Sequence, residues 1–413
     1  MLDIGYIREN ADIVKKACVD KKMPADIGRI IELDAELRKI TTAADELRAR
    51  RNKIAKPGNN PEAIEEGRRI KTELSEFDER HKALKTEFDG LMLHVPSVPA
   101  EGVPIGAAEA DNVELYKIGT PKDKKETPKD HIEIMEALDM VDVARGVKIA
   151  GSRSYFLKND GTMLELAVTR MVLDMLAARG FTPMATPHLV KHGAMQGTGF
   201  FPIGYESTYK LPEDELYLIG TSEVPLVSYH QDEILDKLPI RLAGISSCYR
   251  REAGTYGKDT RGLYRVHQFQ KVEQVIFCEA DHDTALAMHN EILANTEDIL
   301  KALELPYRVC AACTAELGIG QIRKHEVETW MPSREAYCET HSCSTMGDFQ
   351  ARRANIRYRD QNGKTRHVFT LNNTAIASPR ILIPLLENHQ NADGSVYIPK
   401  ALRPYLGGAE RIG

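Results

Sequence analysis

The feature that most constrains the fold is a pair of apolar seams in the first hundred residues. In the first seam, apolar residues recur at alternating steps of three and four, with Arg51 interrupting the pattern: Ile30, Leu33, Leu37, Ile40, Ala44, Leu47 and Ile54. The second seam follows a turn-forming Pro57–Pro61 segment: Ile70, Leu74, Phe77, His81, Leu84, Phe88 and Leu91. This spacing is typical of long helices with one apolar stripe. Because each stripe can be buried only against the other, the two helices must lie antiparallel. We therefore predict a coiled-coil arm within residues 1–103 and a second domain over residues 104–413.

Basic side chains gather towards the predicted turn of this arm. They are Arg48, Arg50, Arg51, Lys53, Lys56, Arg68, Arg69 and Lys71. Only Glu62, Glu65 and Glu66 oppose them between residues 48 and 71. Because the whole chain carries a net charge of -6, any nucleic-acid contact must be local. The arm alone leaves two interpretations open, a solvated coiled-coil face and a phosphate-binding tip.

Composition is that of a soluble globular protein with room for two domains, at 413 residues, 28% charged and 42% hydrophobic. No run approaches the roughly 18 apolar residues of a transmembrane helix, and the start lacks the layout of a signal peptide. We therefore expect a cytoplasmic protein with no membrane partner. Seven cysteines, an odd number, suit a reducing compartment. Cys310 and Cys313 have a metal-like spacing but no clean second ligand pair, so we expect buried thiols there.

Residues 94–130 are rich in Pro, Gly, Asp and Lys, which predicts a connector. Beyond it, helical stretches such as Leu164–Arg179 and His282–Leu303 alternate with short strand-like runs. These runs are Leu216–Ile219, Gln274–Cys278, Ile356–Arg359 and His367–Leu371. Hairpin-sized loops such as Asp360–Gly363 separate some of them, so we predict an α+β fold with an antiparallel sheet flanked by helices. Neither usual Gly-rich nucleotide loop is present.

Two blocks carry most of the chemistry-bearing residues. In the first, Arg250 and Glu252 precede a Gly- and charge-rich loop, and the alternating run after it is fit for a strand. Period-two alternation places three of its side chains on one face: Phe269, Lys271 and Glu273. The second block, Thr370–Arg380, runs from a strand into an apolar helix, with Arg380 at the start of that helix.

These blocks, together with the Pro187 region after a long helix, resemble the three signature motifs of class II aminoacyl-tRNA synthetases. The match is closest to the seryl-tRNA synthetase family, and it covers essentially the whole chain. Four features carry it: Thr221–Glu223, the His267–Glu273 block, Asp348–Arg353 and the basic N-terminal arm. The resemblance implies a homodimer, in which the helix near Leu164–Arg179 and a strand at Thr186–Val190 form the contact between subunits.

The family activates L-serine with ATP and transfers the seryl group to the 3′ end of serine tRNA. Whether selenocysteine tRNA also serves as acceptor stays open. Activation brings the serine carboxylate against the α-phosphate, and a fixed guanidinium can offset the repulsion between these anions. By resemblance Arg250 is that bridge, and Arg380 is a second cation at the pyrophosphate end. Catalysis is then positioning plus electrostatics, without a protein nucleophile.

The resemblance also implies binding residues for each substrate. For serine they are Thr221, Ser222, Glu223, Arg250, Glu273, Asn372 and Thr374. For ATP they are Arg250, Arg251, Glu252, Val266, Phe269, Glu339, Thr340, His341, Ser342 and Arg380. Glu339 and Ser342 resemble the ligands of a Mg²⁺ ion that accompanies ATP. A pocket built to bond a hydroxyl group leaves polar groups unpaired when alanine enters, which is how such a site rejects it.

For the tRNA, the resemblance implies Lys258 and Arg261 as contacts to the acceptor end, in the Gly254–Gly262 loop. It also makes the basic arm the element that grasps the long variable arm of serine tRNA, through phosphate and shape contacts. The sequence departs from the usual family pattern at Arg251, His341 and Thr345.

Three other functions are worth comparing with this one. A relative that loads amino acids onto carrier proteins should lack the long arm. A non-catalytic RNA-binding paralogue should have lost Arg250, Glu273 or Arg380, and all three are present. A plain coiled-coil scaffold leaves residues 131–413 without a purpose.

Overall fold

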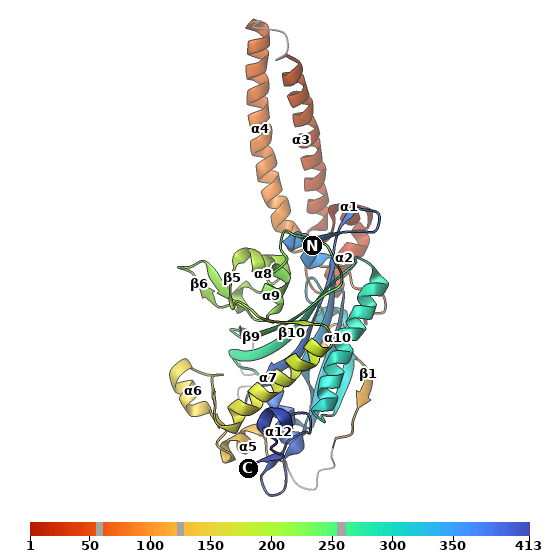
Figure 1. Ribbon diagram of the computed structural model, residues 1–413. Coiled ribbons are helices and arrows are strands. Elements are labelled where there is room, and N and C mark those ends of the chain that lie inside the picture. Colours follow the sequence, from red (N-terminus) through yellow and green to blue (C-terminus); the bar gives the residue numbers. More distant parts are fainter. Residues whose placement is uncertain (55–60, 122–127, 254–261) are drawn as a thin grey trace. The chain divides into compact units, whose positions relative to one another are not determined.

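The computed structural model describes residues 1–54, 61–121, 128–253 and 262–413. They form two compact units, Met1–Val98 and Pro99–Gly413 (Figure 1). The segment just after this division belongs to the second unit, because the Ala100 N–H donates to the Ile322 carbonyl at 2.7 Å.

The first unit is helical: α1 (Ile4–Glu9), α2 (Ala11–Asp20), α3 (Ile27–Ile54) and α4 (Pro61–Met92). Helices α3 and α4 lie side by side in Figure 1, and at about 1.5 Å per residue α3 is about 40 Å long. Their contact buries the predicted seams in two clusters, one around Leu33, Leu37 and Leu84, the other around Ala44, Ile70 and Leu74. The predicted helical arm is therefore confirmed, while residues 57–60 of the predicted turn lie outside the described residues.

The second unit is built on an eight-stranded sheet in the order β1-β11-β12-β13-β16-β10-β9-β4. These strands are β1 (Val113–Ile118), β11 (Tyr307–Ala311), β12 (Arg323–Met331), β13 (Ala336–Gly347), β16 (Phe369–Ser378), β10 (Gln268–Cys278), β9 (Ile240–Tyr249) and β4 (Thr182–Ala185). Every neighbouring pair is antiparallel except β4 and β9 at one edge. The predicted α+β fold with an antiparallel sheet is confirmed.

Two details of the sequence prediction were wrong. The predicted connector contains β1, a strand at the opposite edge of the main sheet that is exposed at all its positions and so shows no apolar alternation. Thr186–Val190 is not one strand. The ladder to β9 ends at Ala185, shortly before Pro187, which has no N–H to donate. The next strand, β5 (Leu189–Lys191), belongs to a separate small sheet with β6 (Lys210–Leu211) and β7 (Leu216–Leu218).

The main sheet has different neighbours on its two faces. Helices α7 (Asp160–Ala178) and α10 (His282–Ala302) pack on one face, against residues such as Ile276 and Cys278 (Figure 1). On the other face, Val275 and Phe277 pack with α9 (Glu223–Ser228) and α11 (Phe349–Ala354). Side chains alternate along β10, so Phe269, Lys271 and Glu273 point to this second face. The site described below lies there.

The remaining elements are short. They are α5 (His131–Ala137), α6 (Val143–Ala150), α8 (His192–Thr198), α12 (Leu382–His389), β2 (Val141–Asp142), β3 (Phe156–Leu157), β8 (Ile234–Leu235), β14 (Arg357–Arg359), β15 (Thr365–His367), β17 (Val396–Tyr397), β18 (Arg411–Ile412) and several 3₁₀ helices, among them η4 (Pro332–Arg334). Among the described residues, no helix combines the length and apolar character that a membrane span requires.

Candidate active site

A cavity of about 290 Å³ lies on the second face of the sheet, over β10, β13 and β16. It brings together ten of the side chains singled out in the sequence: Arg250, Glu252, Val266, Phe269, Glu339, Thr340, His341, Ser342, Thr374 and Arg380. These residues are distant along the chain, and the sheet order places their strands side by side. The cavity is lined by both cations and carboxylates, as a site for a charged ligand requires.

Arg380 is held in place from several sides. Its Nη1 donates to the carbonyl of Glu339 at 3.3 Å and lies 3.4 Å from the carboxylate atom Oε2. Its Nε donates to the carbonyl of Tyr264 at 3.2 Å, and its Cζ lies 4.3 Å from the centre of the Tyr264 ring. Burial opposes ionisation of Glu339, but the charges of Arg380 and neighbouring basic groups prevail and hold its pKa below the ordinary value. The carboxylate of Glu339 is therefore ionised at neutral pH.

Arg250 lies over the face of Phe269, with its Cζ 5.2 Å from the ring centre. Its Nε donates to the carbonyl of Gly220 at 3.3 Å. Glu252 stands nearby in the left-handed backbone region, at φ 52°, and its carboxylate accepts from Arg265 at 3.2 Å. One guanidinium and one aromatic ring thus define a flat, charged wall of the cavity.

Beside the cavity lies a buried layer of polar side chains. Glu223 Oε1 accepts from Gln350 Nε2 at 2.7 Å and from Asn372 Nδ2 at 2.9 Å. Burial, and then the charge of Glu273, raise the pKa of Glu223 to about 7.

Lys271 belongs to the same layer and connects it to the cavity that it also lines. Its Nζ lies 2.5 Å from Glu273 Oε2 and donates to Thr221 Oγ1 at 3.0 Å. The Glu223 N–H donates to the same Thr221 Oγ1 at 3.2 Å, which joins the two sets of bonds. Four of the predicted serine-binding residues therefore form one connected network: Thr221, Glu223, Glu273 and Asn372.

His341, a departure from the usual family pattern, is buried beneath the cavity at 1% exposure. Its Nδ1 lies 2.8 Å from Thr340 Oγ1. Burial, and then the positive charge of Arg380, lower the pKa of His341 to about 3. The imidazole is therefore neutral, and it adds no charge to the site.

Two predicted residues, Arg251 and Ser222, neither line the cavity nor belong to the network beside it. The Arg251 side chain is exposed and donates to the carbonyl of Glu206 at 3.1 Å. Ser222 is fully buried, and its hydroxyl donates to the carbonyl of Gly244 at 3.1 Å.

The predicted tRNA contacts fall in two places. Lys56, Lys258 and Arg261 lie outside the described residues. The other basic residues of the arm are exposed on α3 and α4: Arg48, Arg50, Arg51, Lys53, Arg68, Arg69 and Lys71. Within the described part of the chain, Arg51, Lys53, Arg68 and Lys71 make no ion pair, whereas Arg48 pairs with Asp45 and Asp78. Part of the basic cluster is therefore available for an anionic partner.

Several residues that line the cavity were given no role from the sequence, among them Tyr264, Gln321 and Lys324. Lys324 Nζ lies 2.5 Å from Glu326 Oε1, and the charge of Lys324 is among those that favour ionised Glu339. On β12, Lys324 lies opposite Ser344 of β13, and Glu326 lies opposite Ser342. The only indication in the sequence was the alternation of Lys324 and Glu326, which places both side chains on one face of β12. It points to this cavity only when the register between β12 and β13 is known.

In the part of the chain that the structure describes, no group of three or more His, Cys, Asp or Glu side chains could hold a metal ion. Cys310 and Cys313 are buried free thiols.

The antiparallel sheet and the cavity that gathers Arg250, Phe269, Glu339 and Arg380 are those of a class II aminoacyl-tRNA synthetase. Two family models match the chain: the seryl-tRNA synthetase N-terminal domain over residues 1–99 and the class II core domain (G, H, P, S and T) over residues 206–389. The chain belongs to the seryl-tRNA synthetase family.

Individual relatives are similar to this chain along nearly its full length. The serine–tRNA ligase of Deinococcus radiodurans is 46% identical, over 100% of this chain and 99% of its own. That of Symbiobacterium thermophilum is 41% identical, over 98% of each chain. The solved structure of the Pyrococcus horikoshii seryl-tRNA synthetase complexed with ATP superposes with a TM-score of 0.93 at 38% identity, covering 100% of this chain and 99% of that one.

Proposed function

We propose that this chain activates L-serine with ATP to seryl-adenylate and then transfers the seryl group to the 3′ end of serine tRNA. The observation that carries the proposal is the convergence of Arg250, Arg380 and Glu339 on one cavity that adjoins the buried Glu223 network. The first three suit the triphosphate of ATP and its counter-ion, and the network suits a small amino acid.

Phe269 and Arg250 account for two parts of ATP, the adenine base and the reacting α-phosphate. The open face of an aromatic ring can stack on adenine, and Phe269 is partly exposed in the cavity. Arg250 lies between Phe269 and Gly220, which directly precedes Thr221–Glu223. From there its guanidinium can contact both the α-phosphate and the serine carboxylate, and so offset their repulsion as the new bond forms.

Arg380 is the second cation of the reaction. It is fixed by three hydrogen bonds to Glu339 and Tyr264, so it needs little reorganisation to stabilise charge that develops on the departing pyrophosphate. Preorganised charge of this kind usually provides the largest share of catalysis when no side chain acts as nucleophile.

Mg²⁺ fits the residues present. Glu339 is ionised, Ser342 offers a hydroxyl oxygen, and both line the cavity. Mg²⁺ typically takes one or two protein oxygens and fills its other positions with substrate phosphates and water. Glu339 and Ser342 would hold it, and it would neutralise part of the phosphate charge.

Serine is proposed to bind in the polar network beside the cavity. Glu223 and Thr221 would hold its α-amino group, while Glu273, Asn372 and Thr374 would face its hydroxyl. These groups are buried, so an amino acid without a hydroxyl would leave donors and acceptors unpaired when it binds against them. This chemistry favours serine over alanine.

The tRNA is proposed to bind the exposed basic residues of α3 and α4. Two such residues near the end of α3, Arg51 and Lys53, and two near the start of α4, Arg68 and Lys71, present charge that phosphates can neutralise. Lys258 and Arg261 are proposed to contact the acceptor end.

We also propose that the chain forms a homodimer through the surface that includes α6 and α7. Large apolar side chains are exposed there, a pattern that marks protein interfaces: Val147, Ile149, Phe156, Met163 and Leu166. A reducing location such as the cytoplasm suits the seven free cysteines.

The decisive experiment is serine-dependent ATP–pyrophosphate exchange with the purified protein and magnesium, with alanine and threonine run in parallel. Exchange with serine alone is the expected result. A wild type that exchanges with no amino acid would refute the proposal and favour the non-catalytic RNA-binding paralogue. Charging of serine tRNA, measured next, tests the transfer step.

A further inference from the structure

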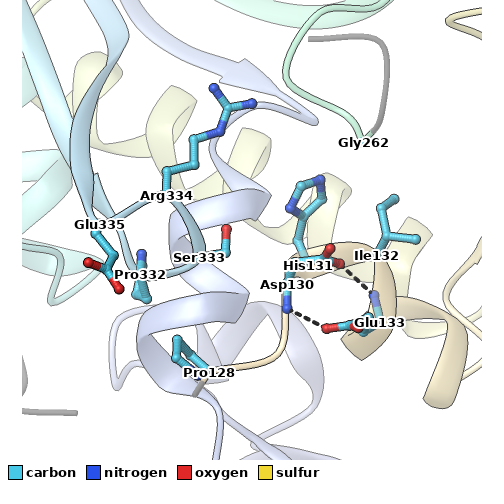
Figure 2. A pocket seen from close by; sticks show the side chains of 10 residues that line it. All are labelled: Pro128, Asp130, His131, Ile132, Glu133, Gly262, Pro332, Ser333, Arg334 and Glu335. Carbon is cyan, nitrogen blue, oxygen red and sulfur yellow. Dashed lines mark hydrogen bonds between the residues drawn. The ribbon is translucent and has the colours of Figure 1, made fainter. Parts of the chain in front are cut away.

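A second cavity, of about 340 Å³, lies between the start of α5, the 3₁₀ helix η4 and Gly262. Figure 2 shows the ring of His131 pointing from the start of α5 towards Gly262, with Arg334 nearby. Gly262 and Leu263 lead into the strand that carries Phe269, so this cavity lies directly behind one wall of the ATP site.

The hydrogen bonds of His131 determine where its proton lies. The Leu263 N–H donates to Nε2 at 3.1 Å, so Nε2 must carry a lone pair. Nδ1 lies 2.9 Å from Glu387 Oε1, and a neutral ring must then carry its proton on Nδ1 and donate it to that carboxylate. Both side chains are buried, at 8% and 0% exposure. His131 therefore joins a backbone N–H at one end to a carboxylate at the other.

Glu387 is fixed by further donors. Its Oε1 accepts from the His131 backbone N–H at 3.1 Å and from the Ser333 hydroxyl at 2.9 Å, and its Oε2 accepts from the Ser333 N–H at 2.9 Å. Glu387 thus joins α5, η4 and α12. A carboxylate held this firmly is a rigid support for the imidazole that rests on it.

The close approach of the chain to His131 requires a glycine. Gly262 has φ +89°, and a Cβ at this position would lie 2.6 Å from His131 Nε2. Any other residue would push the Leu263 N–H away from its acceptor.

From Leu263 the connection continues to the proposed catalytic cation. The neighbouring residue, Tyr264, accepts from Arg380 Nε at 3.2 Å, and its hydroxyl donates to the Glu339 carbonyl at 3.1 Å. Its ring lies 4.3 Å from the Cζ of Arg380 and 4.4 Å from that of Arg334. Arg380 itself lies shortly before α12, the helix that carries Glu387, with Ile381 between them. The contacts thus run from Glu387 through His131, Leu263 and Tyr264 to Arg380.

We propose that His131 is a positioning residue that fixes Leu263 and Tyr264 so that Arg380 is held ready for the phosphates of ATP. The inference rests on the proposed function, because it takes Arg380 as an ATP ligand. The competing explanation is that His131 only stabilises the fold around Glu387.

The test compares two substitutions of His131. His131→Asn keeps an N–H near the position of Nδ1 for Glu387 but has no acceptor that reaches Leu263. His131→Gln places an acceptor at the depth of Nε2 again. ATP affinity is measured by calorimetry and the KM values for ATP and serine by pyrophosphate exchange, each also in an Arg380→Gln background. His282→Asn, on the exposed start of α10, is the matched control.

Loss of positioning should weaken ATP binding about fivefold in His131→Asn, a size typical of coupling through neighbouring groups. The KM for serine should stay within about twofold, His131→Gln should recover most of the loss, and the effect should shrink below about twofold when Arg380 is already replaced. Equal changes for ATP and serine, or an undiminished effect in the Arg380→Gln background, would overturn the proposal.

If His131→Asn does not fold, Gly262→Ala is judged by the same criteria, because its Cβ would separate the Leu263 N–H from His131 Nε2 while both His131 and Glu387 remain in the chain. Calorimetry requires no turnover. A wild type that binds ATP without exchanging pyrophosphate would therefore count against the proposed function alone.

Discussion

Replacing Glu223 by Gln removes one charge from the buried network with almost no change of shape. The amide oxygen can still accept from Gln350 and Asn372, as Oε1 does now. What the variant lacks is a carboxylate to meet the ammonium group of serine. We expect Glu223→Gln to lose serine affinity while its affinity for ATP stays unchanged.

The size of the effect depends on pH because the pKa of Glu223 is raised to about 7, first by burial and then by Glu273. Below this pH the carboxyl group is protonated and cannot pair with an ammonium ion. Its ionised fraction falls from about 0.9 at pH 8 to about 0.1 at pH 6, which follows from one titration centred at 7. The kcat/KM for serine in the free enzyme should therefore fall about tenfold over this range.

The raised pKa of Glu223 also affects the free energy of unfolding. A carboxyl group whose pKa is raised on folding binds its proton more tightly in the folded state, so it destabilises the ionised folded protein. The pKa rises from the ordinary value of 4.5 to about 7. This rise lowers the free energy of unfolding by about 3 kcal/mol at pH 8 and by about 1 kcal/mol at pH 5. Glu223→Gln should therefore melt at a higher temperature than the wild type at pH 8, and the difference should narrow towards pH 5.

The assay is pyrophosphate exchange at saturating ATP from pH 6 to pH 8, with Glu136→Gln as an exposed control on α5. The control should follow the wild-type profile, and Glu223→Gln should show a flat one. If Glu223→Gln retained the tenfold decline, or bound serine as tightly as the wild type does at pH 8, the role given to this carboxylate would be wrong.

Three further predictions address the other parts of the site. Arg250→Gln should lower the kcat of pyrophosphate exchange about 10²- to 10³-fold, the usual cost of losing one preorganised charge donor; single-turnover adenylate formation would measure it. Thr374→Val should reduce the preference for serine over alanine by about tenfold or more, since it deletes a hydroxyl-bonding partner, and the ratio of kcat/KM values reports this. The double change Arg51→Glu with Lys53→Glu should raise the KM for serine tRNA, weaken its salt dependence and leave exchange unaltered. The change Lys82→Glu, exposed on α4 nearer the base of the arm, is its control.

The elements that could be predicted from sequence are those whose buried residues recur at a regular spacing. Over most of their length the seams of α3 and α4 pack against one another, so a heptad pattern was sufficient to pair them. The two failures concern strands at the edges of the main sheet. In β1 every residue is exposed, and β4 carries Pro183 while Pro187 follows shortly after it. In neither case does one face of the strand impose an alternating pattern.

The residues of the site also divide into those that the local sequence predicts and those that it does not. Arg250, Phe269, Glu339 and Arg380 occur in compact blocks whose local spacing is distinctive. Tyr264 and Lys324 could not be found this way, because their importance comes from partners on other elements, Arg380 and Glu339 in particular. His131 is still harder to find from the sequence, since its role depends on a carboxylate and a backbone N–H that are both distant in sequence.

Two carboxyl groups of this site have pKa values shifted in opposite directions, and this difference separates their roles. Basic side chains surround Glu339 and keep it ionised, so it is ready to help hold a cation beside the phosphates. Glu223 is buried and close to Glu273, so its charge is poorly compensated until a ligand brings an ammonium group. In the proposed function serine supplies that group, so the unfavourable burial of the Glu223 charge favours an amino acid as the ligand. The high pKa of Glu223 is thus the expected property of a carboxylate whose proper partner is the substrate.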